Sequence, residues 1–232
     1  MRGASSILSY RILWLTLFEE KRKSNLLAAA GTFMARAVPG VILAAGASSR
    51  LGEPKSLVDI EDSPLVWWAY EHLKNAGCEP IVVVTRAELS VDVLLAVPDA
   101  IVSINAHPET GRTGSLQNGI SSLHSELGRL PRKLVMAPVD RPGWNATLVK
   151  ALMEHDAPVC PIHQGRKGHP VVLSTADLER ILSAPSTTPL RDIVSFQEVP
   201  VDGPWLHLNI DTPESLRNLH EEATELHAYF QQ

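Results

Sequence analysis

One stretch of the sequence, residues 41–57 (VILAAGASSRLGEPKSL), constrains the fold and the chemistry of this chain more than any other. Its first three residues are apolar and two of them are β-branched, which is typical of a buried strand. Small residues follow, and small side chains leave backbone N–H groups open to an anion. Arg50 and Lys55 then add two positive charges. A strand, a small-residue loop and two cations in this order are what a triphosphate requires.

The simpler interpretation of this stretch is a glycine turn after a buried strand, with two cations in solvent. Two familiar phosphate-binding loops are excluded, because the stretch contains neither G-x-x-x-x-G-K-[ST] nor G-x-G-x-x-G. It instead resembles the signature L-A-x-G-x-S-x-R-M-G-x-x-K of nucleotidyltransferases, which move a nucleoside monophosphate onto a phosphorylated acceptor. Within that superfamily, the MobA-like NTP transferases, it is similar to the molybdenum cofactor cytidylyltransferases, with Leu51 where Met is usual.

The resemblance runs from about Val38 to His220 and implies roles for individual residues of the opening loop. Arg50 and Lys55 are implied as catalytic cations that hold the triphosphate. The implied nucleotide-binding residues of the strand end and loop are Leu43, Ala44, Ala45, Gly46, Ser48, Ser49 and Gly52.

Composition and charge limit the classes of protein to which the chain can belong. With 232 residues and 44% apolar content it can bury one core, which predicts a single domain. The net charge of −5 and the aromatic content of 5% argue against a nucleic-acid partner. The apolar run at residues 7–18 is too short and too polar to span a membrane. Cys78 and Cys160 form no disulfide framework or metal motif, so we expect a cytoplasmic protein.

Residues 1–37 are interpreted as an N-terminal extension, followed by a nucleotidyltransferase domain over residues 38–232. A signal peptide is a poor match, because the charged residues 19–23 separate the apolar run from the small residues 26–30. A plainer hypothesis is that the working protein begins at Met34, so that residues 1–33 have no catalytic part. Mass spectrometry of the native N-terminus tests this hypothesis, and finding Met1 there contradicts it.

Apolar runs that alternate with helical patterns predict a parallel sheet built from right-handed crossovers. Ser63 is expected to cap a helix that Pro64 opens and that ends near Gly77. Further helices are expected near residues 91–97, 116–123, 145–154, 176–182, 190–194 and after 212, and further strands at 81–85, 101–104, 134–137, 158–162, 171–173, 197–201 and 205–208. The expected fold is a single three-layer, Rossmann-like α/β domain with a mostly parallel sheet.

A polar, glycine-rich loop over residues 105–115 leads from one predicted strand into a helix. Ligands of open α/β sheets bind beyond the carboxyl ends of the strands, so this loop should face the same crevice as the opening loop. Ser115 lies near a helix N-terminus, where its hydroxyl or backbone N–H can contact phosphate or base. The alternative is a long turn with an N-capping serine. The family resemblance places base and ribose against Asn105, Gly111 and Ser115.

Two acidic residues that follow predicted strands are candidate ligands for Mg²⁺, an ion that prefers oxygen donors. Asp140 follows the strand at 134–137, and its alternative role is to cap the next helix. The T-P-E sequence after Asp211 is accounted for as a helix opening, which leaves Asp211 and Asn209 unexplained. The resemblance implies that Asp140 is the catalytic, metal-binding aspartate of a G-D-x-P element, with Val139 in place of Gly. It also implies Asp211 as the second metal ligand, with Asn209 in reserve.

The glycine-flanked basic turn G-R-K-G-H-P at residues 165–170 is either the solvated tip of a hairpin or part of an acceptor site. The family has G-x-x-G-H-P on the acceptor side, so the resemblance implies that Lys167, Gly168, His169 and Pro170 bind the acceptor. A phosphate monoester is already ionised and attacks without a base. We therefore expect His169 to position the acceptor rather than to donate a proton.

The resemblance implies a cytidylyltransferase that transfers CMP from CTP to the phosphate of a molybdopterin-type cofactor, with Mg²⁺ and with release of pyrophosphate. A recipient molybdoenzyme or its chaperone is the implied protein partner. CTP is favoured by Ala45, where related guanylyltransferases have a second glycine, because an added methyl crowds a purine more than a pyrimidine. The alternatives are a guanylyl- or other nucleotidyltransferase acting on another phosphorylated acceptor, and a non-catalytic nucleotide or cofactor carrier. A carrier has no use for Asp140 and Asp211 together.

Overall fold

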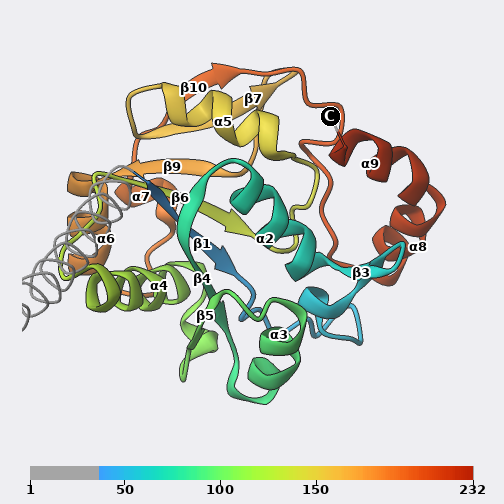
Figure 1. Cartoon of the computed structure of the whole chain (residues 1–232), viewed down its shortest axis with the longest axis horizontal. Helices are drawn as coiled ribbons and strands as arrows, with labels where there is room; N and C mark the ends of the chain where they lie inside the picture. The colour runs from blue at the N-terminus through green and yellow to red at the C-terminus, as the bar shows by residue number, and fades with distance from the viewer. Residues whose placement is uncertain (1–36, 232) are drawn as a thin grey trace, which may run out of the picture. The chain divides into compact units, whose positions relative to one another are not determined.

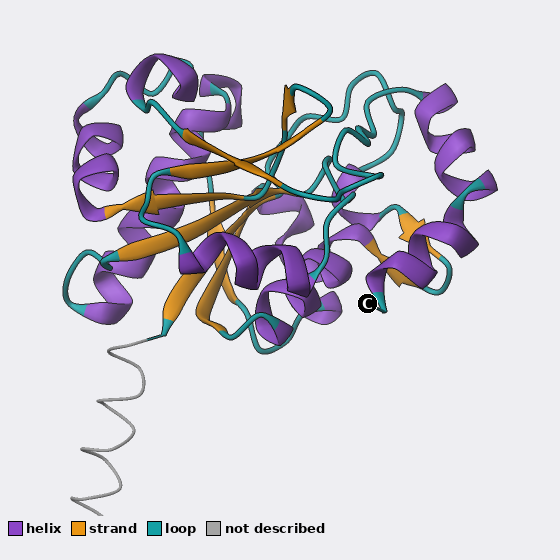
Figure 2. Cartoon of the chain, turned by 90° about the horizontal axis from the view of Figure 1, so that it is seen from above, coloured by secondary structure: helices purple, strands orange, loops and turns teal. Residues whose placement is uncertain are grey.

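The computed structural model describes residues 37–231. The predictions of an N-terminal extension and of a start at Met34 therefore fall almost entirely on residues outside the described range. From Val38 onward the chain alternates between strands and helices (Figure 1). Figure 2 shows the strands side by side in one twisted sheet with helices on both of its faces.

The central sheet of the described residues has eight strands in the order β10-β7-β9-β6-β1-β4-β5, with β8 paired to β7. These strands are β1 (Val38–Leu43), β4 (Cys78–Thr85), β5 (Ile101–Ile104), β6 (Lys133–Pro138), β7 (Val159–His163), β8 (Arg166–Lys167), β9 (Val171–Ser174) and β10 (Gln197–Pro200). Strand β1 is parallel to β4 and β6, β4 to β5, and β10 to β7. Only β8 and β9 run antiparallel to their neighbours in this sheet. The predicted mostly parallel α/β fold is confirmed.

Helices cover the two faces of the sheet in separate groups. One face carries α2 (Leu65–Asn75), α3 (Ser90–Ala96) and α5 (Ala146–Glu154), together with α8 (Pro213–Glu221) and α9 (Ala223–Phe230), which pack into the same core. The other face carries α4 (Arg112–Leu127), α6 (Thr175–Ser183) and α7 (Leu190–Ile193). Within residues 37–231, no helix combines the length and the apolar character that crossing a bilayer requires.

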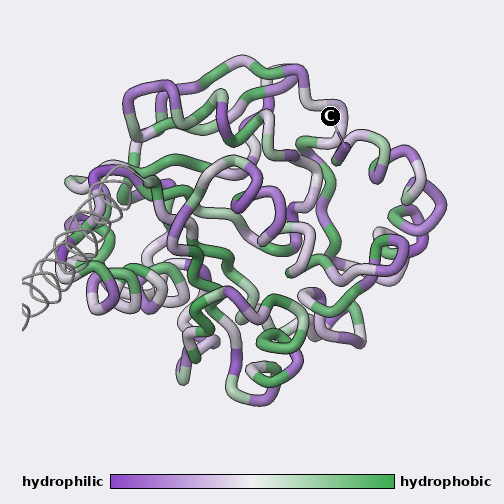
Figure 3. The backbone as a smooth tube through the Cα atoms, in the orientation of Figure 1, coloured by the Kyte–Doolittle hydropathy of each residue, from purple (hydrophilic) through white to green (hydrophobic). Residues whose placement is uncertain are grey.

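Neighbouring residues of the central strands belong to different cores, because side chains alternate across a pleated strand. In β1, Val41 and Leu43 pack under α4, whereas Ile42 packs on the opposite face. In β6, Met136 and Ala137 divide in the same way. Both faces of these strands are buried, which explains their uninterrupted apolar sequence. Figure 3 shows this hydrophobic character along the central strands.

The start of α2 differs from the prediction that Ser63 caps the helix. Ser63 and Pro64 form strand β3, which pairs with β2 (Asp59–Ile60) in a short hairpin. Pro64 is the N-cap residue, and no side chain caps the helix. The backbone N–H of Leu65 donates to the carbonyl of Val58 at 2.8 Å. This backbone bond satisfies one of the N–H groups at the start of the helix, for which the Ser63 side chain was the expected acceptor.

The segment expected as a strand at residues 205–208 is a turn. Leu206 donates to the carbonyl of Gly203 at 3.0 Å and Leu208 to that of Trp205 at 2.9 Å. These local i to i+3 bonds use the backbone groups that a strand would offer to a neighbour.

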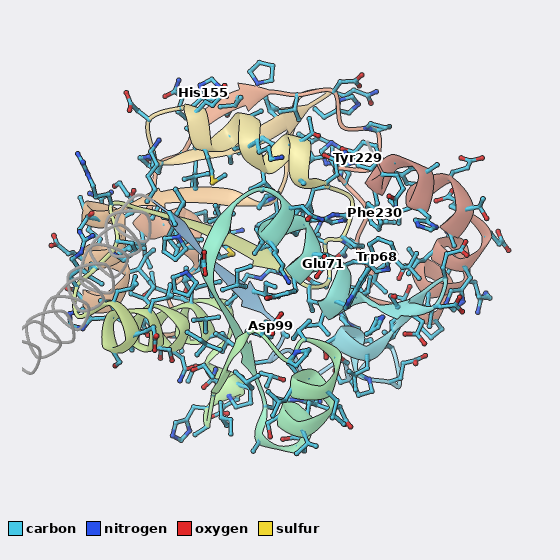
Figure 4. All side chains as sticks on the ribbon, viewed as in Figure 1. Trp68, Glu71, Asp99, His155, Tyr229 and Phe230 are labelled. Carbon is cyan, nitrogen blue, oxygen red and sulfur yellow. The ribbon has the colours of Figure 1, made fainter. Side chains whose placement is uncertain are left out.

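The C-terminal end of the chain adds a helix, α9, beyond the predicted α8. Trp68 of α2 lies beside Phe230 of α9 (Figure 4), with ring centroids 4.9 Å apart. The indole N–H of Trp68 donates to the carbonyl of Ile60 at 3.2 Å, and 7% of the residue is exposed. Trp68 is therefore a packing residue, as its helical position indicates, and it docks α9 on the core.

Candidate active site

The carboxyl ends of β1 and β6 lie next to each other, and the loops that follow them line a cavity of about 270 Å³. The N-terminus of α4 forms the opposite wall. Nine predicted site residues line this cavity: Leu43, Ala44, Ala45, Gly46, Ser48, Lys55, Gly111, Ser115 and Asp140. We call it the nucleotide cavity, after the ligand that the sequence analysis expects for these residues. Ser49, Arg50, Gly52, Asn105 and Asp211 are not part of its lining.

Ser48 organises the opening loop. Its hydroxyl oxygen accepts a hydrogen bond from the backbone N–H of Lys55 at 3.0 Å, and its carbonyl accepts from Leu51 and Gly52 at 3.0 and 3.3 Å. The backbone of Ser48 has φ of 52°, a left-handed conformation that a serine adopts only when its surroundings support it. These bonds close the loop and direct the chain from the end of β1 to Lys55.

Lys55 connects the two predicted metal-binding acids. Its ammonium donates to Oδ1 of Asp211 and lies 3.7 Å from Oδ2 of Asp140. The Lys55 and Asp140 side chains are only 14% and 16% exposed, so this charge cluster is poorly screened by water. The hydrogen bond from Lys55 is the main reason that the pKa of Asp211 lies below its usual range, and the charge of Arg50 adds to the effect. Arg50 is 74% exposed, with a guanidinium nitrogen 4.0 Å from Asp211.

The backbone brings Asp140 and Asp211 together although 70 residues separate them in sequence. The N–H of Ile210 donates to the carbonyl of Asp140 at 3.0 Å, and the N–H of Val139 donates to the carbonyl of Leu43 at 3.0 Å. Val139 itself is buried, with 6% exposure, so a valine is accommodated where the family pattern has glycine. The end of β6 is thus tied to β1 on one side and to the C-terminal segment on the other.

Asp140 does not cap α5. The N-cap of that helix is Asn145, whose side-chain oxygen accepts from the N–H of Leu148 at 3.0 Å. The alternative role for Asp140 is therefore wrong, and its carboxylate is left to Lys55 and, at 3.6 Å, to Arg112.

The acids and their neighbour fit a hard divalent cation. Asp140 and Asp211 supply carboxylate oxygens, and Asn209 donates to Asp211 while its own side-chain oxygen is buried without a partner in the described structure. No group of three or more His, Cys, Asp or Glu residues suited to a metal occurs within residues 37–231. A set of two carboxylates suits Mg²⁺, which is commonly held by one or two carboxylates together with substrate phosphates.

Asn105 does not line the nucleotide cavity but hydrogen-bonds to residues of the loop and helix that do. Only 7% of this residue is exposed, and its amide donates to the Ser115 hydroxyl at 3.1 Å while its oxygen accepts from the N–H of His107 at 2.9 Å. Ser115 in turn donates to the carbonyl of Gly111 at 3.2 Å. Gly111 has φ of +90°, which side chains rarely tolerate, and this turn presents the start of α4 to the cavity. Asn105 therefore fixes the loop, whereas Gly111 and Ser115 face the ligand space.

A second cavity of about 390 Å³ lies on the other side of the α4 N-terminus. Lys167, Gly168 and His169 line it, and Pro170 does not. We call it the acceptor cavity, after the role that the sequence analysis expects for these residues. Gly168 packs so tightly on the turn at 203–208 that an added Cβ would lie 2.4 Å from Cγ of Leu206. The ammonium of Lys167 lies 3.0 Å from the carboxylate of Glu198, so part of its charge is already compensated.

His169 is neutral over the physiological pH range. Burial, with the positive charges of Arg112 and Arg141, lowers its pKa from 6.5 to about 3. A neutral imidazole is a poor proton donor, and the positioning of the acceptor by His169 stays a prediction.

Sequence reasoning missed two parts of this region. Arg112, the first residue of α4, lines both cavities, but a lone arginine after a glycine carries no pattern that marks it. The segment 185–189, interpreted only as a linker, forms a wall of the acceptor cavity. Helix α4 holds this wall, because Thr113 donates to the carbonyl of Thr188 at 2.6 Å and Gln117 to that of Ala184 at 2.8 Å.

The mostly parallel sheet, the small-residue loop with its lysine, and the paired acids define a nucleotidyltransferase. The chain belongs to the family of MobA-like NTP transferase domains, whose model matches residues 40–201.

Individual relatives agree with this assignment. The molybdenum cofactor cytidylyltransferase of Escherichia coli K12 is 24% identical over 202 residues, which cover 82% of this chain and 99% of that protein. A probable molybdenum cofactor guanylyltransferase of Bacillus mycoides is 30% identical over 135 residues, or 55% of this chain and 63% of the relative. The crystal structure of Rv0371c from Mycobacterium tuberculosis H37Rv shares the fold with a TM-score of 0.70 at 21% identity, covering 80% of this chain and 97% of that one. A complex of Rv0371c with manganese is also known.

Proposed function

We propose that this nucleotidyltransferase transfers CMP from CTP to the phosphate of a molybdopterin-type cofactor and releases pyrophosphate. The observation that carries the proposal is Lys55, which lies between two carboxylates at the end of a small-residue loop. The near full-length match to a cytidylyltransferase supports the choice of nucleotide and acceptor.

The proposed reaction is an in-line displacement at phosphorus. An oxygen of the acceptor phosphate forms a bond to the α-phosphorus of CTP, and the bond from that phosphorus to the bridging oxygen of the β-phosphate breaks. Pyrophosphate leaves with the electron pair. The backbone N–H groups near Gly46, together with Lys55 and Arg50, hold the triphosphate and offset its charge. No general base is needed, because the acceptor phosphate is already ionised, and the neutral state of His169 is consistent with this.

Asp140 and Asp211 would hold Mg²⁺, with the free side-chain oxygen of Asn209 as a further donor. When bound, this ion supplies positive charge to the phosphate oxygens and the leaving pyrophosphate. The manganese complex of Rv0371c supports a divalent metal in a protein of this fold.

Selection of CTP is proposed to depend on Ala45. This residue lines the nucleotide cavity and is 2% exposed, so its methyl group cannot move away from a bound base. A methyl at this point narrows the space for a purine. The relatives include both cytidylyl- and guanylyltransferases.

The test is pyrophosphate release with each of CTP, GTP, ATP and UTP, with Mg²⁺, in the presence and absence of molybdenum cofactor. Release that requires both CTP and the cofactor is expected. Release with GTP would preserve the mechanism and overturn the role given to Ala45. Binding of CTP without release would contradict the proposed acceptor, and a screen of phosphorylated acceptors would then separate another transferase from a carrier.

A further inference from the structure

Arg112 occupies the junction of the two cavities. It is the first residue of α4, and with Gly111 it is common to the linings of the nucleotide and acceptor cavities. Gly111 contributes only backbone, so Arg112 supplies the side chain that reaches both spaces. Its side chain is 46% exposed, which leaves the guanidinium accessible to a ligand.

The guanidinium of Arg112 has unused hydrogen-bonding capacity. Arginine carries five N–H donors in a planar fork. In the described structure the one ion pair of Arg112 joins it to Oδ2 of Asp140 at 3.6 Å, a distance too long for a good hydrogen bond. Asp140 has a second cationic neighbour in Lys55, so it does not depend on Arg112 for charge compensation.

A second arginine reinforces the positive charge at the same place. Arg141 follows Asp140 directly, and its Nε is buried with no hydrogen-bond partner among residues 37–231. Both Arg112 and Arg141 act electrostatically on His169, a residue of the acceptor-cavity wall. Arg141 does not line either cavity, so it adds positive charge near this wall, while Arg112 supplies the guanidinium that an anion in the cavities can contact.

We propose that Arg112 binds the phosphate of the acceptor at the junction of the cavities and holds it against the α-phosphate of the bound nucleotide. This inference rests on the proposed function and names the residue that recognises the acceptor as a phosphate monoester. The attacking oxygen belongs to the phosphate held by Arg112, and the bond that breaks joins the α-phosphorus to pyrophosphate. Arg112 stays protonated throughout. Its fork lowers the repulsion between two phosphate groups that must approach each other, which a single lysine ammonium does less well.

The kinetic test compares Arg112→Ala and Arg112→Lys with Arg129→Ala. Arg129 is exposed just beyond the far end of α4, so its removal makes the same change of charge away from the cavities. We expect Arg112→Ala to raise KM for the acceptor and to lower kcat/KM for the acceptor by about ten- to a hundredfold. KM for CTP should change by much less. Arg112→Lys should recover part of the loss, and Arg129→Ala should match the wild type. Unchanged acceptor kinetics in Arg112→Ala, or an effect confined to CTP, would overturn the inference.

A binding measurement separates this inference from the proposed function. Inorganic phosphate is titrated calorimetrically into the wild type, Arg112→Ala and Arg129→Ala, with circular dichroism to check that each is folded. Phosphate affinity should fall about tenfold or more in Arg112→Ala and stay near the wild-type value in Arg129→Ala. Equal binding by Arg112→Ala, or no binding by the wild type, would overturn the inference. Arg112-dependent phosphate binding without any transfer to molybdenum cofactor would support the anion site and contradict the proposed acceptor.

Discussion

The nucleotide cavity and the acceptor cavity meet at Arg112 but are built in different ways. The nucleotide cavity is formed by one continuous loop after β1, by the end of β6, and by the start of α4, and its lysine and aspartate are mostly buried. The acceptor cavity is assembled from segments far apart in the sequence, including residues 110–113, residues 167–169 with Val171, and residues 186–191. Its lysine is 56% exposed and already paired with Glu198. The first cavity is thus defined by backbone and buried charge, and the second by side chains on turns and a linker.

This difference predicts that the chemistry is concentrated in the nucleotide cavity, whereas changes in the acceptor cavity should alter which acceptor is used.

Loss of the Asp140 carboxylate should have the largest effect. Asp140→Asn keeps the shape of the side chain and removes its charge, and we expect kcat to fall on the order of 10³-fold because the proposed metal ligand is lost. The free energy of unfolding should change little, since the structural tie to Ile210 uses the backbone carbonyl of Asp140. The measurement is pyrophosphate release with a urea unfolding curve on the same sample. Asp192→Asn, a half-exposed acid of α7, is the control. Near wild-type turnover by Asp140→Asn would remove the metal role from this residue.

Loss of Lys55 should lower kcat on the order of 10²-fold, as expected when one charged donor to the phosphates is deleted. Lys55→Met preserves most of the apolar stem, and Lys150→Met on the exposed side of α5 is the matched control.

Lys55→Met should also change how stability depends on pH. The hydrogen bond from Lys55 holds the pKa of Asp211 below its usual 3.8, so it stabilises the wild type above that value and is lost as the pH falls through the folded-state pKa. Lys55→Met should lose this part of the acid dependence of unfolding. If the free energy of unfolding of Lys55→Met fell at acid pH as it does in the wild type, the pairing of Lys55 with Asp211 would be contradicted.

The same contrast explains which features could be predicted from the sequence. The nucleotide side combines an apolar run, small residues and spaced charges within one segment, so its strand, loop and cations could be read directly. The proposed metal site depends on two acids 71 positions apart in sequence, which only the resemblance connected. The structure brings these acids together through Ile210 and Lys55.

Tertiary contacts explain the wrong or missing predictions. Ser63 looks like a helix cap, but pairing with β2 makes it part of a strand. Trp205 and its neighbours are apolar enough for a strand, but their backbone bonds close locally. Arg112 has no sequence pattern of its own, and its place between two cavities depends on how α4 packs on the sheet.

The acceptor cavity should show its neutral histidine in the pH dependence of stability. The pKa of His169 is about 3 in the folded protein against an ordinary value of 6.5, so the unfolded chain binds more protons between these values. Stability is therefore fully present above pH 6.5 and falls as the pH is lowered toward 3. His169→Asn should lessen this fall when urea unfolding at about pH 7 is compared with about pH 5. His124→Asn, at an exposed position of α4, should leave it unchanged. If the free energy of unfolding fell equally in His169→Asn and in the wild type, the lowered pKa of His169 in the folded protein would be contradicted.

Substitution of Ala45 should have the smallest effect and should change selectivity rather than rate. Ala45→Gly removes the methyl group at the cavity wall, and a difference of one methyl group is worth about tenfold in discrimination. We expect the ratio of kcat/KM for CTP to that for GTP to fall by up to about that factor, mainly through a gain with GTP. Stability should fall by roughly 0.5–1 kcal/mol, because glycine has more backbone freedom in the unfolded chain. Ala106→Gly, in the loop after β5 and outside the cavity lining, controls for this backbone effect. If the ratio of kcat/KM for CTP to that for GTP were the same in the two variants, Ala45 would not select the base. Base selection would then depend on the residues near Gly111 and Ser115.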